Sequence, residues 1–149
     1  MVPTSAATTP APPYGPRIDY VAAQKVMAAA EAEALENGWA VAIAIVDSAA
    51  LLVMLHKLDG TQHSSVEVAI AKAQTAVNFR KATKVYEDAV AAGGDGLRFL
   101  GMPGLVPLEG GFPIVVEGAI IGGIGVSGVR SDLDARIANA GLAALADPS

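Results

Sequence analysis

PLEGGFPIVVEG (residues 107–118), continuing directly into AIIGGIGVSG (residues 119–128), is the segment from which the fold follows. It predicts two apolar strands joined by a tight turn at Glu117-Gly118, because each run is short and rich in Ile and Val. Glycines inside a strand give up side-chain packing, so we expect another group to approach the backbone closely at residues 122–125. That neighbour would be a packed helix, a second subunit or a ligand.

The segments before this hairpin predict a second pair of strands. Residues 39–46 and 51–56 are apolar runs that are too short for typical helices, and residues 47–50 form a turn between them. Strands that pair as hairpins, with helices on their faces, indicate an antiparallel α+β sandwich rather than a parallel sheet.

Helix-capping residues predict the helices. Asp19 caps the first helix, which runs to Asn37 and is stopped by Gly38. Ser64, with Glu67 three residues later, forms a capping box for the second helix.

Two further helices follow the same logic. Thr83 caps a short third helix, which residues 93–94, both glycine, bring to an end. Residues 131–134 open the last helix, and their acidic side chains suit the positive end of its dipole.

Composition bounds the class of protein. The 149 residues are 52% hydrophobic with a mean hydropathy of +0.44, which favours one compact domain that hides further apolar surface in an oligomer. The net charge of −5 argues against nucleic acid or an anionic membrane as a partner, and no run of about 18 uncharged apolar residues predicts a membrane span. The absence of cysteine excludes disulfides, thiolate zinc sites and cysteine nucleophiles, and it fits a cytoplasmic location.

Residues 1–17 differ from the rest of the chain. They are rich in Pro, Ala and Thr and lack the basic and apolar regions of a secretory signal. We therefore predict a flexible arm over residues 1–17, followed by a single domain over residues 18–149.

Several short motifs, in their order and spacing, resemble the GlcG/HbpS family, also called the haem-degrading or haem-binding domain and found at the C-terminus of some PduO-type proteins. The resemblance covers about residues 18–146. The matching motifs are Asp59-Gly60, residues 65–67, the helix at residues 69–76, Phe79, Thr83, and residues 104–107, 109–113 and 124–128.

The resemblance implies a profilin-like sandwich with a five-stranded antiparallel sheet flanked by helices, assembled as tetramers or octamers. It also implies a small-ligand pocket, with haem or iron as the ligand in some members. Within the matching motifs, Asp59, Thr75, Phe79, Gly110, Gly111 and Pro113 are the predicted ligand-binding residues.

Residues 123–128 also match the G-x-G-x-x-G pattern of dinucleotide-binding proteins. That pattern belongs to the first turn of a βαβ unit, with an acidic residue at the end of the next strand. Here one helix follows and no second strand, so close packing is the better interpretation of these glycines.

The two histidines are the candidate metal ligands. His56 and His63, with Asp59 between them, could bind iron together, or one imidazole could ligate haem iron. The alternative is that each is an ordinary half-exposed polar residue.

Charged residues offer candidate catalytic groups. Lys72 interrupts an alanine-rich helix, where its ammonium could receive a carboxylate ligand or simply extend into solvent. Glu67 could act as a base, although the capping box already accounts for it. Glu109 precedes two glycines whose bare amides could hold an anion or a carbonyl oxygen, and the following Pro113 is compatible with an edge strand.

Two functions of different classes follow. The first is an oligomeric small-ligand or haem-binding protein, accessory to small-molecule catabolism or sensing. The second is an enzyme of small organic acid catabolism, of isomerase or lyase type, with Glu67, Glu109 or a histidine as base and Lys72 holding the carboxylate or enolate. A structural accessory subunit with an empty pocket is a third interpretation.

Overall fold

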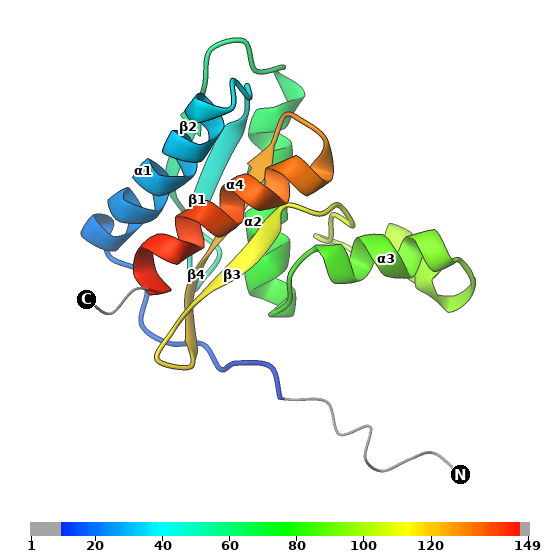
Figure 1. The fold of residues 1–149 in the computed structure, drawn as a ribbon. Coiled ribbons are helices and arrows are strands. Elements are labelled where there is room, and N and C mark those ends of the chain that lie inside the picture. Colours follow the sequence, from blue (N-terminus) through cyan, green and yellow to red (C-terminus); the bar gives the residue numbers. More distant parts are fainter. Residues whose placement is uncertain (1–9, 147–149) are drawn as a thin grey trace.

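The structure is a computed structural model that describes residues 10–146. Four α-helices, one 3₁₀ helix and four strands follow one another along this part of the chain (Figure 1). Their order and bounds are α1 (Tyr20–Glu36), β1 (Ala42–Asp47), β2 (Leu52–Lys57), α2 (Ser64–Phe79), α3 (Lys84–Ala92), η1 (Gly94–Gly101), β3 (Gly111–Val116), β4 (Ala119–Ser127) and α4 (Ser131–Ala146).

The strands form one antiparallel sheet in the order β2-β1-β4-β3. The predicted α+β class with an antiparallel sheet flanked by helices is confirmed. The expected number of five strands is wrong for residues 10–146, which contain four, and a profilin-like arrangement is not established.

A short segment before α1 pairs with one end of β4 without forming a strand. Gly15 donates to the Ile120 carbonyl at 2.8 Å, Ile18 donates to the Ile121 carbonyl at 2.8 Å, and Tyr14 forms one parallel bridge with Ile120. β1 ends opposite Gly122, which leaves this end of β4 open to the passing chain. A single bridge is too short to count as a strand. The first nine residues of the predicted arm lie outside the described residues.

The predicted hairpin of β3 and β4 is confirmed. Its turn residues Glu117 and Gly118 have φ angles of 51° and 79°. Both lie in the left-handed region that a tight two-residue hairpin turn requires. β3 is an edge strand, which is where the sheet can accommodate Pro113.

A helix approaches Gly123 and Gly125 of β4, whereas a Cβ on Gly122 would lie 2.4 Å from the Val46 carbonyl oxygen of β1. A Cβ placed on Gly125 would lie 2.1 Å from the Ala69 carbonyl oxygen, and one on Gly123 would lie 2.8 Å from the Ala73 oxygen. The glycines therefore allow α2 to pack against the backbone of the sheet. Because both lie within a strand, their pattern is not a phosphate-binding turn.

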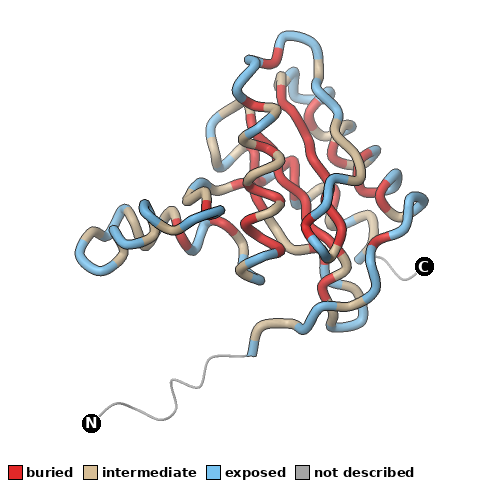
Figure 2. The backbone as a smooth tube through the Cα atoms, turned by 180° about the vertical axis from the view of Figure 1, so that it is seen from behind, coloured by how far each residue is buried: buried red, intermediate tan, exposed pale blue. Residues whose placement is uncertain are grey.

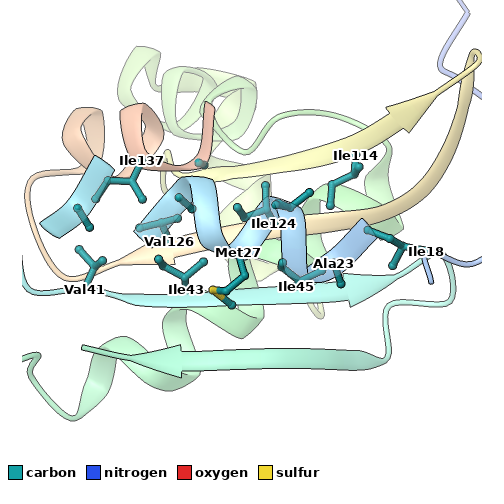
Figure 3. Packing of buried hydrophobic residues seen from close by; sticks show 14 residues of the cluster. Ile18, Ala23, Met27, Val41, Ile43, Ile45, Ile114, Ile124, Val126 and Ile137 are labelled. Carbon is teal, nitrogen blue, oxygen red and sulfur yellow. The ribbon is translucent and has the colours of Figure 1, made fainter. Parts of the chain in front are cut away.

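The sheet separates two hydrophobic clusters that follow from the alternation of β1. Ile43 and Ile45 point to the face covered by α1 and α4, whereas Ala42 and Ala44 point to α2. Figure 1 shows α1 and α4 side by side on one face and α2 on the other. Figure 2 shows the buried residues concentrated on the central strands and the facing sides of the helices. In Figure 3 the larger cluster fills the space between α1 and the sheet.

Both capping predictions for α1 hold, whereas those for the starts of α2 and α3 do not. Asp19 accepts from the Ala22 amide at 2.8 Å, and Gly38 has the left-handed φ of 68° expected of a helix stop. The capping box is wrong: the N-cap of α2 is His63, whose backbone is helical and whose side chain caps nothing. Thr83 precedes α3 as predicted but does not cap it, because its hydroxyl bonds to Gly111.

α3 and η1 project from the body of the molecule (Figure 1). The sequence predicts the end of α3 at the two glycines but not the 3₁₀ helix that follows them. A chain of edge-to-face aromatic contacts links the projection to α2, with ring centroids 5.7 Å apart between Phe79 and Tyr86 and 4.9 Å apart between Tyr86 and Phe99.

Candidate functional site

The structure distributes the predicted site residues over several separate places. Lys72 and the two glycines after Glu109 meet at a buried polar junction beside the start of β3, and the Glu109 carboxylate lies 3.9 Å from Lys84 Nζ at the start of α3. His56 lines a hollow between α1 and β2, and Asp59 lines a second hollow at the C-terminal end of α1. The convergence that we expected is therefore partial.

Lys72 is a buried residue, so of the two alternatives left open by the sequence, that of a solvated lysine is wrong. Its Nζ donates to the Val126 carbonyl at 2.8 Å and to Asp134 Oδ2 at 3.1 Å. The second oxygen of Asp134 accepts from the Val129 amide at 3.1 Å. The ion pair therefore joins α2 to the end of β4 and the start of α4.

Burial raises the pKa of Asp134 above its ordinary value, against the opposing effects of the Lys72 ammonium and of backbone amides. The ammonium thus favours the ionised form of this buried carboxyl group. With both of its bonds made inside the protein, Lys72 has a structural role that the sequence alone did not reveal. The role that the enzyme interpretation gives to Lys72, holding a bound carboxylate, stays a prediction.

The amides around Glu109 are also used within the protein. Glu109 donates its own N–H to Glu87 Oε1 at 3.2 Å, and Gly111 donates to Thr83 Oγ1 at 2.9 Å. Ser131 Oγ donates to the same Glu87 oxygen at 3.3 Å. These bonds tie the start of β3 to the starts of α3 and α4, and of the two glycine amides that we expected to hold a ligand oxygen, that of Gly111 is already engaged.

The remaining predicted residues of this region contact other parts of the chain. Thr75 Oγ1 donates to the Ala71 carbonyl at 2.7 Å and accepts from the Val106 amide at 3.0 Å. Phe79 begins the aromatic chain described above. Thr75 thus orders the loop that leads into β3.

Glu67 and His63 lie exposed at the start of α2. His63 Nδ1 is 3.4 Å from Lys57 Nζ. Among residues 10–146, no group of three or more His, Asp or Glu side chains lies in an arrangement that could hold a metal ion. The predicted set of His56, Asp59 and His63 is therefore not assembled into a common site.

Among the predicted site residues, His56 pairs with a carboxylate and also lines a hollow. It lies near the end of β2, with its side chain 46% exposed, and its Nδ1 pairs with Oε1 of Glu31 on α1. Beside it is a hollow of about 310 Å³, lined by Tyr20, Gln24, Met27, Ala28, Glu31, Met54 and His56.

The second hollow has a volume of about 360 Å³. Asp59 and Lys57 contribute its charged groups, and the rest of its wall is formed by Ala34, Leu35, Gly38, Trp39, Ala40 and Leu58. Of the predicted ligand-binding residues, only Asp59 reaches it.

The family model described as haem degrading protein HbpS-like matches residues 18–143. The chain belongs to the HbpS-like family. Protein GlcG of Escherichia coli strain K12 is 40% identical over 105 residues, which cover 70% of this chain and 77% of GlcG. The resemblance seen in the sequence is thereby confirmed.

Two solved structures of the HbpS-like type support the same assignment. A double mutant of Streptomyces reticuli HbpS superposes with a TM-score of 0.80 at 32% identity, covering 93% of this chain and 98% of HbpS. The PduOC:haem complex superposes with a TM-score of 0.78 at 28% identity, covering 86% of this chain and 94% of PduOC.

Sequence reasoning missed the partners of the predicted residues in this HbpS-like chain. Asp134 is 62 positions from Lys72 and Glu31 is 25 positions from His56, so no local motif connects them. The sequence contains one signal for such a partner: a lysine on an apolar helix face needs a buried carboxylate to pair with. The acidic first turn of α4 could have supplied that candidate.

Proposed function

We propose that this chain is an oligomeric small-ligand-binding protein of the GlcG/HbpS type, with haem as its ligand and His56 as the iron ligand. The family description names haem degradation, and a similar solved structure is a complex with haem. Among the residues of this chain, the pairing of His56 with Glu31 beside an open hollow carries the proposal.

The pairing orients the imidazole in the way that metal-binding histidines need. Such histidines nearly always bond through their other ring nitrogen to a carboxylate or carbonyl, which fixes the tautomer and raises the basicity of the ligating nitrogen. Here Glu31 occupies Nδ1, so Nε2 is the atom that would bind iron. His63 is the weaker candidate, because the Lys57 ammonium beside its Nδ1 opposes the approach of a cation.

The hollow suits one part of a porphyrin. Met27, Ala28 and Met54 offer an apolar surface, and Tyr20 and Gln24 add polar groups. Its volume of about 310 Å³ lies at the lower limit of ordinary ligand pockets, roughly 300 Å³. A haem bound to His56 would therefore extend beyond it and be covered by a second subunit. When bound, haem would supply redox-active iron.

Assembly and location belong to the same proposal. Tetramers or octamers would provide the second surface for haem, and the exposed Tyr20 and Val21 lie on the helix that borders the hollow. No helix in residues 10–146 is both long and apolar enough to cross a membrane. We infer a cytoplasmic location from the lack of cysteine. We also infer a role accessory to small-molecule catabolism or sensing.

A haemin titration of the purified protein, followed by absorbance, tests the proposal. We expect a Soret band that shifts and saturates at one haem per subunit or per pair of subunits. His56→Ala should lose the shift, and His63→Ala, the matched control, should retain it. Titrations that do not saturate, or that are unchanged in His56→Ala, would contradict the proposal.

A further inference from the structure

We infer that the hollow at the C-terminal end of α1 binds a small zwitterion, an α-amino acid with an apolar side chain. This site shares no lining residue with the His56 hollow and does not depend on haem. The inference rests on the charges at its rim, the polarity of the adjoining helix end and its apolar wall.

The rim carries one group of each charge, two positions apart. Lys57 ends β2 and Asp59 lies in the turn that follows, so the two groups flank Leu58. An α-amino acid carries an ammonium and a carboxylate on the same carbon, so each of its charges has an opposite charge to bind among the residues that line this hollow. The carboxylate would bind Lys57 and the ammonium would bind Asp59.

The C-terminal end of α1 favours the same orientation of the ligand in the hollow. Leu35, at the end of that helix, and Gly38, just after it, line the hollow, and the last turn of α1 contains no basic residue. The C-terminal end of a helix carries partial negative charge that attracts cations. The ammonium of the ligand would therefore be held by Asp59 and the helix end together, whereas a simple carboxylate would meet repulsion from both.

The rest of the wall is apolar. Leu35, Trp39 and Leu58 offer a surface for a branched aliphatic side chain. The indole of Trp39 is held in place by the Arg136 guanidinium, 5.3 Å from its ring centroid, and Arg136 in turn bonds to Glu33 at 2.8 Å. The wall is thus braced from α4, and the volume of about 360 Å³ suffices for a ligand of this size.

The chain contains one tryptophan, so its fluorescence reports on this hollow alone. We would titrate L-leucine and two analogues, 4-methylpentanoate without the ammonium and 3-methylbutylamine without the carboxylate. Saturation transfer to the leucine methyl groups in NMR gives a second readout. We expect saturable binding of L-leucine by either readout and binding of both analogues weaker by about tenfold or more.

Variants locate the site on the protein. Asp59→Asn and Lys57→Met should each weaken L-leucine binding by about tenfold. The matched controls Asp95→Asn and Lys25→Met, exposed residues elsewhere on the chain, should not change it. His56→Ala should still bind L-leucine, so loss of haem and loss of this site are distinguishable. The absence of saturable L-leucine binding by both readouts, equal binding of 4-methylpentanoate, or unchanged binding in both site variants would overturn the inference.

Discussion

Lys72 and Asp134 form a buried ion pair whose removal has a predictable cost. Lys72→Met leaves the buried Asp134 carboxylate without its cation. Breaking such a pair from one side usually costs about 3–5 kcal/mol of the free energy of unfolding. Urea unfolding at neutral pH should show a loss of that size, whereas exposed Lys81→Met should stay within about 0.5 kcal/mol. Equal losses in the two variants would show that the pair has no such role.

The pH dependence of that loss has a definite sign. Burial raises the pKa of Asp134 even with Lys72 present, and without the ammonium the pKa should rise further. A carboxyl whose folded pKa is raised binds protons more readily in the folded state, so its destabilising effect is relieved as the pH falls through that value. The penalty of Lys72→Met should therefore be smaller at about pH 4.5 than at about pH 7.5. A penalty that grows on acidification would refute this account.

At the scale of elements, α2 packs directly against the backbone of β4. A Cβ on Gly125 would lie 2.1 Å from the Ala69 carbonyl oxygen, so Gly125→Ala must push the helix away from the sheet. Overpacking of this kind costs about 1–3 kcal/mol or more. Thermal unfolding should show the loss, and Gly101→Ala, where a Cβ meets no atom within 4 Å, should remain close to the parent protein. A neutral Gly125→Ala would mean that α2 is not held tightly against the strand.

Elements with local signals could be predicted from the sequence, and elements set by distant contacts could not. The Asp19 cap, the two hairpins and the turn at Glu117 depend on neighbouring residues, and all are confirmed. The capping box failed because a box needs an extended backbone at the N-cap, whereas His63 is already helical. Thr83 failed as a cap because a strand far along the chain uses its hydroxyl.

The candidate site was less predictable for the same reason. The types of its residues were evident, but their partners come from other elements. Lys72 appeared to be either solvated or open to a ligand until Asp134 was placed beside it, and His56 had no orienting group until Glu31 was placed beside it. Sequence spacing cannot report such pairs when the two residues lie in different elements.

At the scale of the whole molecule, the projection formed by α3 and η1 exposes apolar side chains to solvent in a single subunit. Val85, Leu97 and Leu100 on it are about half exposed or more. If a second subunit covers these side chains, Leu97→Ser with Leu100→Ser should lower the assembly mass measured by light scattering toward the 15.0 kDa of one chain. Val115→Thr, on an edge strand, is the control and should keep the parent mass. A parent protein of 15.0 kDa would contradict the proposed tetramer or octamer.

The most direct test of the central claim, that His56 ligates haem iron, is chemical rescue. His56→Gly removes the imidazole and leaves a space beside Glu31 and Met54 that free imidazole can enter. We expect the haemin-loaded variant to lack the Soret band of the parent protein and to regain it when imidazole is added, while His63→Gly needs no imidazole. A His56→Gly variant that shows the parent spectrum without imidazole would contradict the claim.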